Sequence, residues 1–162
     1  MIVPGPVKTV PVVDLDRYVG TWFEVARFDN VFQRGCAGDV TATYAKRPDG
    51  RLDVINRCRR ADGSMTTAAG VARVVDITTR AKLKVRFAPA FLSWLPMVWG
   101  DYWIIGLADD YSWVVVGTPD REYLWILSRT PALDDSIYQE LVTFGRRLGF
   151  PTEHLLRAPV LN

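Results

Sequence analysis

Few side chains in this sequence could act as nucleophiles, general bases or metal ligands. The chain has two cysteines, Cys36 and Cys58, and a single histidine, His154, near the C-terminus. The cysteines lack a CxxC partner and a histidine at ligand spacing, so the sequence predicts no metal site. A Ser/His/Asp or Cys/His pair would have to recruit its base from the tail. We therefore expect no metal, no cofactor and no catalytic triad, and either one disulfide or two free thiols.

Glu24 is the acidic side chain whose position matters most. It lies in the stretch GTWFEVARFD, where small, charged and bulky residues alternate. If Trp22 faces the interior of the fold, strand alternation turns Glu24 and Phe28 inward as well. Arg27 would then face outward. A buried carboxylate must be hydrogen-bonded, paired or protonated, and Arg129 or a tyrosine could satisfy it, either as an anchor in a pocket or as part of a network that fixes Trp22.

The elements that hold these residues are predicted to be strands. Between Gly20 and Arg129, short β-branched and aromatic runs alternate with turn residues, which is typical of an antiparallel sandwich or barrel. One amphipathic pattern predicts a helix over about 134–148. Nothing divides the chain, so we expect one domain over residues 1–162. The expected strands lie near residues 20–28, 39–46, 51–60, 65–75, 81–88, 101–108, 112–118 and 123–129.

Eight up-and-down strands with short turns favour closure, because a barrel leaves no exposed edges and eight strands can enclose one small ligand. We expect an all-β fold, an eight-stranded antiparallel β-barrel over about 20–129 with one C-terminal α-helix packed on the outside. A sandwich with a filled core is the alternative that the pattern leaves open.

Composition excludes several classes of partner. Of the 162 residues, 49% are hydrophobic and 23% are charged, and the net charge is +2. These values fit neither a disordered chain nor a polycation that neutralises phosphates, so we expect no nucleic-acid partner. No apolar run is long enough to span a membrane. The start of the chain shows neither a leader peptide nor an acylated cysteine.

Three separated stretches would converge at one end of such a barrel. GTW begins the first strand, ADDY turns between the sixth and seventh strands, and SRTP follows the eighth. An arginine over the indole of Trp22 would gain a cation–π contact and seal that end. The residues expected to form this closure are Gly20, Trp22, Asp110, Tyr111 and Arg129.

These motifs, with DREYLWILSRTP and the closing helix, resemble those of the lipocalin family from about Asp14 to Phe150. The resemblance implies a non-enzymatic carrier of a hydrophobic ligand at or near a membrane. Within the family the chain is similar to bacterial outer-membrane lipoproteins, which implies the periplasm or the outer membrane. It lacks their acylated cysteine, and its turn lacks the usual threonine before the aspartate.

Strand alternation in the family's register gives the residues expected to line the cavity. They are mostly apolar with a few polar groups, as in a site for an apolar chain with one polar end, such as a fatty acid or a lysophospholipid. Small side chains at Ala42, Gly70 and Ala72 favour a hollow over a filled interior. The expected ligand-binding residues are Phe28, Tyr44, Val54, Asn56, Ala68, Val85, Phe87, Tyr102, Ile104, Val114, Tyr123 and Trp125.

Two other functions stay open. The barrel could carry a different apolar ligand, such as a retinoid, a sterol or a tetrapyrrole. Alternatively, a free Cys58 with a lowered pKa could serve as the nucleophile of a thiol isomerase.

The connection between the fifth and sixth strands, APAFLSWLPMVWG, is too apolar for a solvated loop. It could cover the mouth of the barrel, contact a membrane, or form a homodimer contact. The residues expected to make this contact are Phe91, Leu92, Trp94, Leu95 and Trp99.

Cys36 and Cys58 are both expected at the open end of the barrel, because the second and third strands pair through the turn at residues 48–50. This proximity favours a disulfide, which would indicate an oxidising compartment such as the periplasm.

Overall fold

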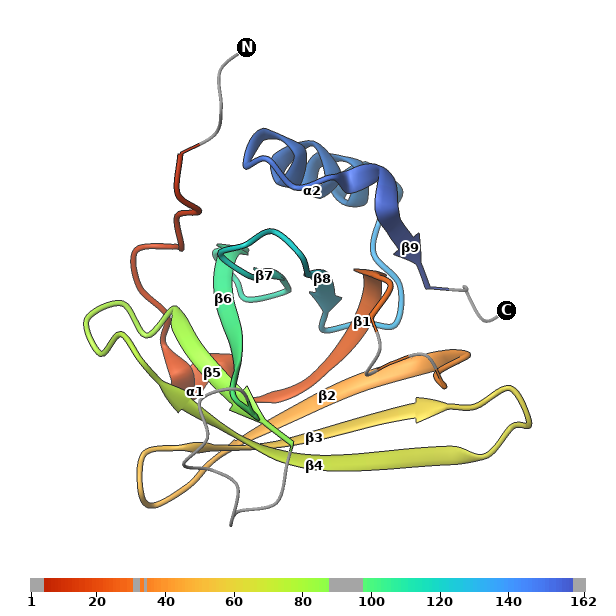
Figure 1. The fold of residues 1–162 in the computed structure, drawn as a ribbon, viewed down its shortest axis with the longest axis horizontal. Helices are drawn as coiled ribbons and strands as arrows, with labels where there is room; N and C mark the ends of the chain where they lie inside the picture. Colours follow the sequence, from red (N-terminus) through yellow and green to blue (C-terminus); the bar gives the residue numbers. More distant parts are fainter. Residues whose placement is uncertain (1–4, 31–32, 34, 88–97, 159–162) are drawn as a thin grey trace.

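Eight strands form a closed antiparallel barrel in the computed structural model of the protein (Figure 1). The structure describes residues 5–30, 33, 35–87 and 98–158. The strand order is β2-β3-β4-β5-β6-β7-β8-β1-β9, and β1 also pairs with β2, which closes the ring. The barrel strands are β1 (Gly20–Phe28), β2 (Gly38–Lys46), β3 (Leu52–Arg59), β4 (Met65–Val74), β5 (Lys82–Arg86), β6 (Gly100–Leu107), β7 (Trp113–Gly117) and β8 (Leu124–Ser128).

The predicted fold class is confirmed, and the filled sandwich is excluded. The helix expected over about 134–148 is α2 (Asp135–Arg147). Three short elements were not predicted, because none is long enough to give a periodic pattern. They are α1 (Leu15–Tyr18), the 3-10 helix η4 (Thr152–His154) and β9 (Leu155–Arg157). Within the described ranges, no helix combines the length and the apolarity needed to cross a bilayer.

A β-bulge in β1 reverses part of the expected orientation of this strand. The register of β1 against β8 shifts between Glu24 and Ala26, and one extra residue in a strand turns the following side chains to the opposite face. Beyond the bulge, Arg27 lies opposite Trp125, whose side chain packs against the interior cluster. Arg27 therefore faces the lumen, and the expectation that it faces outward is wrong.

The same bulge turns Phe28 away from the lumen. Ala26 lies opposite Ile126, and both belong with Phe28 to a buried cluster on the outer side of the barrel. The ring of Phe28 lies 6.4 Å from that of Phe150, centroid to centroid. Phe28 is thus part of the outer core, and its expected place among the ligand-binding residues is wrong.

α2 covers the outer face of the barrel beside β7 and β8 (Figure 1). Its buried side chains Tyr138 and Leu141 share the outer cluster with Val115 of β7. A Cβ added at Gly106 would come within 2.9 Å of the ring of Phe144. The bare backbone of Gly106 therefore lets the helix approach the sheet closely.

β1 changes its neighbour halfway along one edge. Residues 20–23 pair with β2, whereas residues 26–28 pair with β9. β1 and β2 thus separate beyond Phe23, and the open end of the barrel lies on this side. The connection between the two strands carries Gln33, which reaches back to Glu24, just beyond the point where β1 leaves β2.

Candidate binding site in the barrel lumen

Trp22 and Arg129 close one end of the barrel. Trp22 is fully buried, and its Nε1 donates to the carbonyl oxygen of Tyr18 at 2.9 Å. The guanidinium carbon of Arg129 lies 3.7 Å from the centre of the Trp22 ring. Its Nη2 donates to the carbonyl oxygens of residues 17–19. The cation therefore stacks on the indole and ties the segment before β1 to the end of β8.

Position 20 requires a glycine for this arrangement. Gly20 has a φ of +106°, in the region that favours glycine. A Cβ there would also lie 3.2 Å from Nη1 of Arg129. The first glycine of GTW thus makes room for the guanidinium.

The turn between β6 and β7 joins the same end. The hydroxyl of Tyr111 accepts a hydrogen bond from the backbone N–H of Asp14 at 2.9 Å. The guanidinium of Arg17 lies 4.1 Å from the centre of the Tyr111 ring. Hydrogen bonds from Ser112 to Asp110 shape the turn and lower the pKa of the Asp110 carboxyl. All three stretches singled out in the sequence therefore meet at the closed end.

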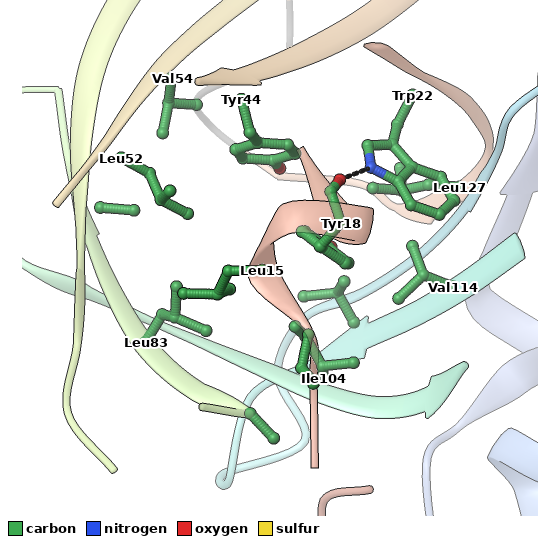
Figure 2. Close-up of a cluster of buried hydrophobic side chains, with 14 residues drawn as sticks. Leu15, Tyr18, Trp22, Tyr44, Leu52, Val54, Leu83, Ile104, Val114 and Leu127 are labelled. Atoms are coloured by element: carbon green, nitrogen blue, oxygen red, sulfur yellow. Dashed lines mark hydrogen bonds between the residues drawn. The ribbon is translucent and has the colours of Figure 1, made fainter. Parts of the chain in front are cut away.

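Three tyrosines from three elements form a polar layer beside Trp22. Tyr102 of β6 shares hydrogen bonds with the hydroxyls of Tyr44, at 2.9 Å, and of Tyr18. Figure 2 shows Tyr18 and Tyr44 next to Trp22. Burial raises the pKa of Tyr44 to about 12 and also raises the pKa values of Tyr18 and Tyr102. The three hydroxyls therefore stay neutral and act as a hydrogen-bonded unit.

Replacing Tyr102 with phenylalanine is expected to lower the free energy of unfolding by about 1–3 kcal/mol, because two buried hydroxyls lose their shared partner. Chemical denaturation measures this loss. The matched control is Tyr123→Phe, since the Tyr123 hydroxyl makes no hydrogen bond in the described part of the chain and its loss is expected to cost less than about 0.5 kcal/mol. Equal stability of the Tyr102 variant and the wild type would contradict the assigned role.

The lower part of the lumen, next to the closed end, is a packed core. Figure 2 shows side chains from several strands converging on Leu15 and Tyr18 of α1. The members contributed by β2 to β7 are all at most 5% exposed. Among the expected lining residues, this buried part holds Tyr44, Val54, Ile104 and Val114.

The upper part of the lumen is accessible from the open end. Ala68 and Gly70 share a strand face with the buried Ala72, yet Ala68 is exposed and Gly70 is half-buried. Val85, opposite Ala72, is also half-buried. The exposed surface of these inward-facing residues shows that this part of the inner wall is only partly covered by other side chains. The other half-buried lining residues are Asn56, Tyr102, Tyr123 and Trp125.

Phe87 and Asn56 mark the rim and the wall of this space. Phe87 is 44% exposed and packs over Gly70, where a Cβ would lie 2.7 Å from its ring. The Oδ1 atom of Asn56 is buried, and no described residue forms a hydrogen bond with it. A hydrogen-bond donor on a bound molecule would satisfy it.

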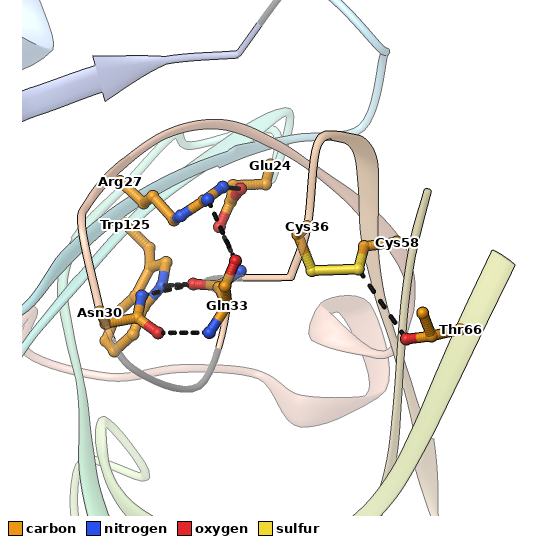
Figure 3. Close-up of a disulfide and its surroundings, with 8 residues drawn as sticks. All are labelled: Glu24, Arg27, Asn30, Gln33, Cys36, Cys58, Thr66 and Trp125. Atoms are coloured by element: carbon orange, nitrogen blue, oxygen red, sulfur yellow. Dashed lines mark hydrogen bonds and ion pairs between the residues drawn. A yellow bond between two sulfur atoms is a disulfide. The ribbon is translucent and has the colours of Figure 1, made fainter. Parts of the chain in front are cut away.

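A buried polar cluster lies where β1 and β2 separate, at the open end of the barrel (Figure 3). Arg27 Nη1 donates to one oxygen of Glu24 at 2.8 Å, and Gln33 Nε2 donates to the other at 2.8 Å. The side-chain oxygen of Gln33 in turn accepts from Trp125 Nε1 at 3.1 Å and from Asn30 Nδ2 at 2.6 Å. Gln33 therefore connects β1, β8 and the connection between β1 and β2.

Glu24 is held by partners other than the expected ones. Arg27 and Gln33 satisfy its oxygens, whereas Arg129 binds backbone carbonyls at the closed end. Burial raises the pKa of Glu24, and the hydrogen bonds and charge of Arg27 and Gln33 oppose this rise. The carboxyl thus has a higher affinity for a proton than a solvated glutamate has.

Cys36 and Cys58 form a disulfide that fixes this connection, as predicted. The bond joins the connection between β1 and β2 to the end of β3, with the two Cα atoms 5.5 Å apart. The backbone N–H of Cys36 also donates to the carbonyl of Gln33 at 2.9 Å. A bonded Cys58 has no thiolate to offer, so the thiol-isomerase alternative is wrong.

Trp99 does not belong to an exposed apolar surface. It is 8% exposed and packs under the guanidinium groups of Arg73 and Arg86, at 4.6 and 5.3 Å from its ring. The expectation that Trp99 contributes to a membrane or dimer contact is therefore wrong. The other four residues of that expected surface, Phe91, Leu92, Trp94 and Leu95, lie outside the described residues.

Sequence reasoning missed Tyr18, Arg27 and Gln33 as lumen residues. Tyr18 lies four residues before Trp22, and at this spacing its backbone carbonyl accepts the indole N–H of Trp22. The bulge that turns Arg27 inward has no signature in GTWFEVARFD. In the described ranges, no group of three or more histidine, cysteine or acidic side chains is arranged to hold a metal ion.

Comparison with known proteins identifies relatives of the whole barrel. The family model described as a lipocalin-like domain matches residues 13–160. The outer membrane lipoprotein Blc of Escherichia coli (strain K12) is 44% identical over 151 residues, which cover 91% of this chain and 81% of that protein. Temperature-induced lipocalin-1 of Arabidopsis thaliana is 37% identical over 154 residues, which cover 94% and 82% of the two chains.

Among solved structures, insecticyanin from the tobacco hornworm Manduca sexta superposes with a TM-score of 0.74. The match covers 99% of this chain and 87% of insecticyanin at 16% sequence identity. At this identity the likeness supports the shared barrel fold only.

Proposed function

The chain belongs to the lipocalin family, and we propose that it binds a single-chain lipid with an anionic or zwitterionic head, a fatty acid or a lysophospholipid, in the upper lumen. As in other members of the family, the barrel binds a hydrophobic ligand without catalysing a reaction. It acts as a carrier or a store for the lipid.

The observation that carries this proposal is the exposed inner surface of small residues between a closed floor and an open mouth. Ala68 faces inward and is exposed, and Gly70 faces inward and is half-buried beside the exposed ring of Phe87. Burying an alkyl chain against such a wall contributes about 0.8 kcal/mol for each methylene group. The polar cluster around Glu24 lies toward the same open end, where the head of a bound lipid would end.

We also propose that the protein works in the bacterial cell envelope, at or near a membrane. The relatives named Blc are outer membrane lipoproteins, and the Cys36–Cys58 disulfide favours an oxidising compartment. Phe87, 44% exposed at the rim, would contact the bilayer surface during loading.

Two neighbouring alanines of β4 provide a matched test of the lumen. Ala68 and Ala69 are both exposed, but they project from opposite faces of the strand. Ala68→Trp places an indole inside the mouth, and Ala69→Trp places one on the outside. Binding of palmitic acid and of palmitoyl lysophosphatidylcholine is measured by native mass spectrometry and by displacement of a fluorescent fatty acid.

We expect Ala68→Trp to weaken binding of both lipids by about tenfold or more, because the indole occupies apolar surface that the alkyl chain of the lipid would otherwise cover. Ala69→Trp is expected to bind like the wild type. Equal binding by the two variants, or binding of a retinoid, sterol or tetrapyrrole in preference to both lipids, would overturn the proposal.

A further inference from the structure

We propose that Arg27 binds the anionic group of the lipid in the lumen and that Glu24 competes with this anion as a protonatable partner of the same guanidinium. The ligand chemistry is an oxyanion at the end of an apolar chain, either a carboxylate or a phosphate. This inference rests on the proposed function, because it assigns the recognition of the head to residues of that lumen.

Arg27 has more donors than the protein uses. A guanidinium carries five N–H groups in a planar fork. Nη1 donates to Glu24 at 2.8 Å, and Nη2 reaches the carbonyl of Gln33 only at 3.5 Å. Nε is buried and has no hydrogen-bond partner among the described residues. The edge formed by Nε and Nη2 is therefore the one that remains to be satisfied.

This edge, with an unpaired Nε and one long hydrogen bond at Nη2, has the geometry that an oxyanion needs. Two parallel N–H groups on one side of a guanidinium bind both oxygens of a carboxylate or phosphate. The side chain of Arg27 is 16% exposed, so an anion there would be shielded from water. Charge-assisted hydrogen bonds are stronger in such a setting than at a solvated surface.

Glu24 occupies the other side of the same guanidinium. Its side chain is 4% exposed, and its oxygens accept from Arg27 and Gln33. While Glu24 is ionised, the pair is neutral, and its carboxylate repels a second anion. When Glu24 is protonated, the cluster carries the full charge of Arg27 and attracts the anion.

Among the described residues, the other side chains that hydrogen-bond to Arg27 and Glu24 carry no charge of their own, and Arg27 is the charged group that acts on Glu24. The residues that bond to the cluster from β8 and from the connection between β1 and β2 are Trp125, Asn30 and Gln33, all neutral. The direction of the pKa shift of Glu24 is upward, because burial disfavours its ionised form. Protonation of Glu24 as the pH falls should therefore strengthen anion binding.

The test compares two probes of equal chain length, dodecyl sulfonate and dodecanol, both used below the concentration at which the sulfonate forms micelles. A sulfonate keeps its charge throughout the titration, unlike a fatty acid. The probes displace a fluorescent fatty acid from the full-length protein. The variants are Arg27→Gln, Glu24→Gln and the double variant, with Arg57→Gln, an exposed arginine of β3, as the control.

The wild type and Arg57→Gln are expected to prefer the sulfonate, whereas Arg27→Gln should lose about tenfold or more in sulfonate affinity with dodecanol binding unchanged. Glu24→Gln should bind the sulfonate more tightly at about pH 8 and lose the increase that the wild type shows down to about pH 5. The double variant keeps the cluster neutral, so it reports the loss of the anion site even if Arg27→Gln alone folds poorly.

Three results would overturn this inference while leaving the proposed function intact. The first is an equal loss of affinity for both probes in Arg27→Gln, and the second is a wild-type affinity for the sulfonate that does not change with pH. The third is displacement of the sulfonate by inorganic phosphate at the same concentration, because this would indicate a site for the free anion. If neither dodecyl sulfonate nor dodecanol binds the wild type, the proposed function itself fails.

Discussion

Replacing Trp22 with alanine is expected to lower the free energy of unfolding by about 3–5 kcal/mol, the range typical of large aromatic side chains removed from a core. Trp22 is fully buried, donates to the carbonyl of Tyr18 and lies under the guanidinium of Arg129. Alanine would leave a cavity and remove the surface on which Arg129 stacks. Guanidinium chloride denaturation followed by circular dichroism measures the change.

Trp103→Ala is the matched control for this prediction. Trp103 is half-buried on the outer side of the barrel, with the ammonium of Lys82 4.4 Å from its ring centre. Its removal exposes less new cavity surface, so we expect a loss well below that of Trp22→Ala. A larger loss for Trp103→Ala than for Trp22→Ala would show that the closed end does not hold the barrel together.

Removing the disulfide is the second change with a large expected effect. Cys36 and Cys58 are 22 residues apart, and a crosslink over a loop of this size stabilises a protein by about 3 kcal/mol. We expect the double variant Cys36→Ala/Cys58→Ala to lose about that amount in chemical denaturation. Reduction of the wild type with a dithiol should produce the same loss, because it breaks the same crosslink.

The disulfide also positions part of the polar cluster, which gives this prediction a second readout. Cys36 donates to the backbone carbonyl of Gln33, and Gln33 accepts from Trp125 Nε1. Without the crosslink, Gln33 should leave Trp125, and the indole fluorescence should change at denaturant concentrations where the barrel is still folded. An alanine double variant as stable as the wild type, with unchanged fluorescence, would contradict this role.

The positions of the strands could be predicted because their signals are local. Alternating apolar and polar residues, and turn residues such as Asp49 and Gly50, recur at short intervals. Each boundary of the eight barrel strands lies within two residues of its expected position, whereas β9 was not predicted. The closed end could also be predicted. In an up-and-down barrel, the start of the first strand with GTW, the turn ADDY and the end of the last strand with Arg129 all lie at the same end.

The polar side of the lumen could not be predicted, because it depends on irregular backbone. The bulge between Glu24 and Ala26 exchanges the faces of Arg27 and Phe28, and strand alternation is valid only for a regular strand. The position of Gln33 depends on the disulfide and on the separation of β1 from β2 beyond Phe23. Both features involve residues that are distant in the sequence.

Binding of the alkyl chain inside the lumen can be observed as nuclear Overhauser contacts between the bound chain and the methyl groups of the protein. With dodecyl sulfonate bound, we expect contacts to the inward-facing methyls of Ala42, Ala68 and Val85. We expect none to Ile105, Val115 and Ile126, which are buried in the outer cluster. Contacts confined to the outer cluster or to the surface of α2, with none in the lumen, would contradict binding inside the barrel.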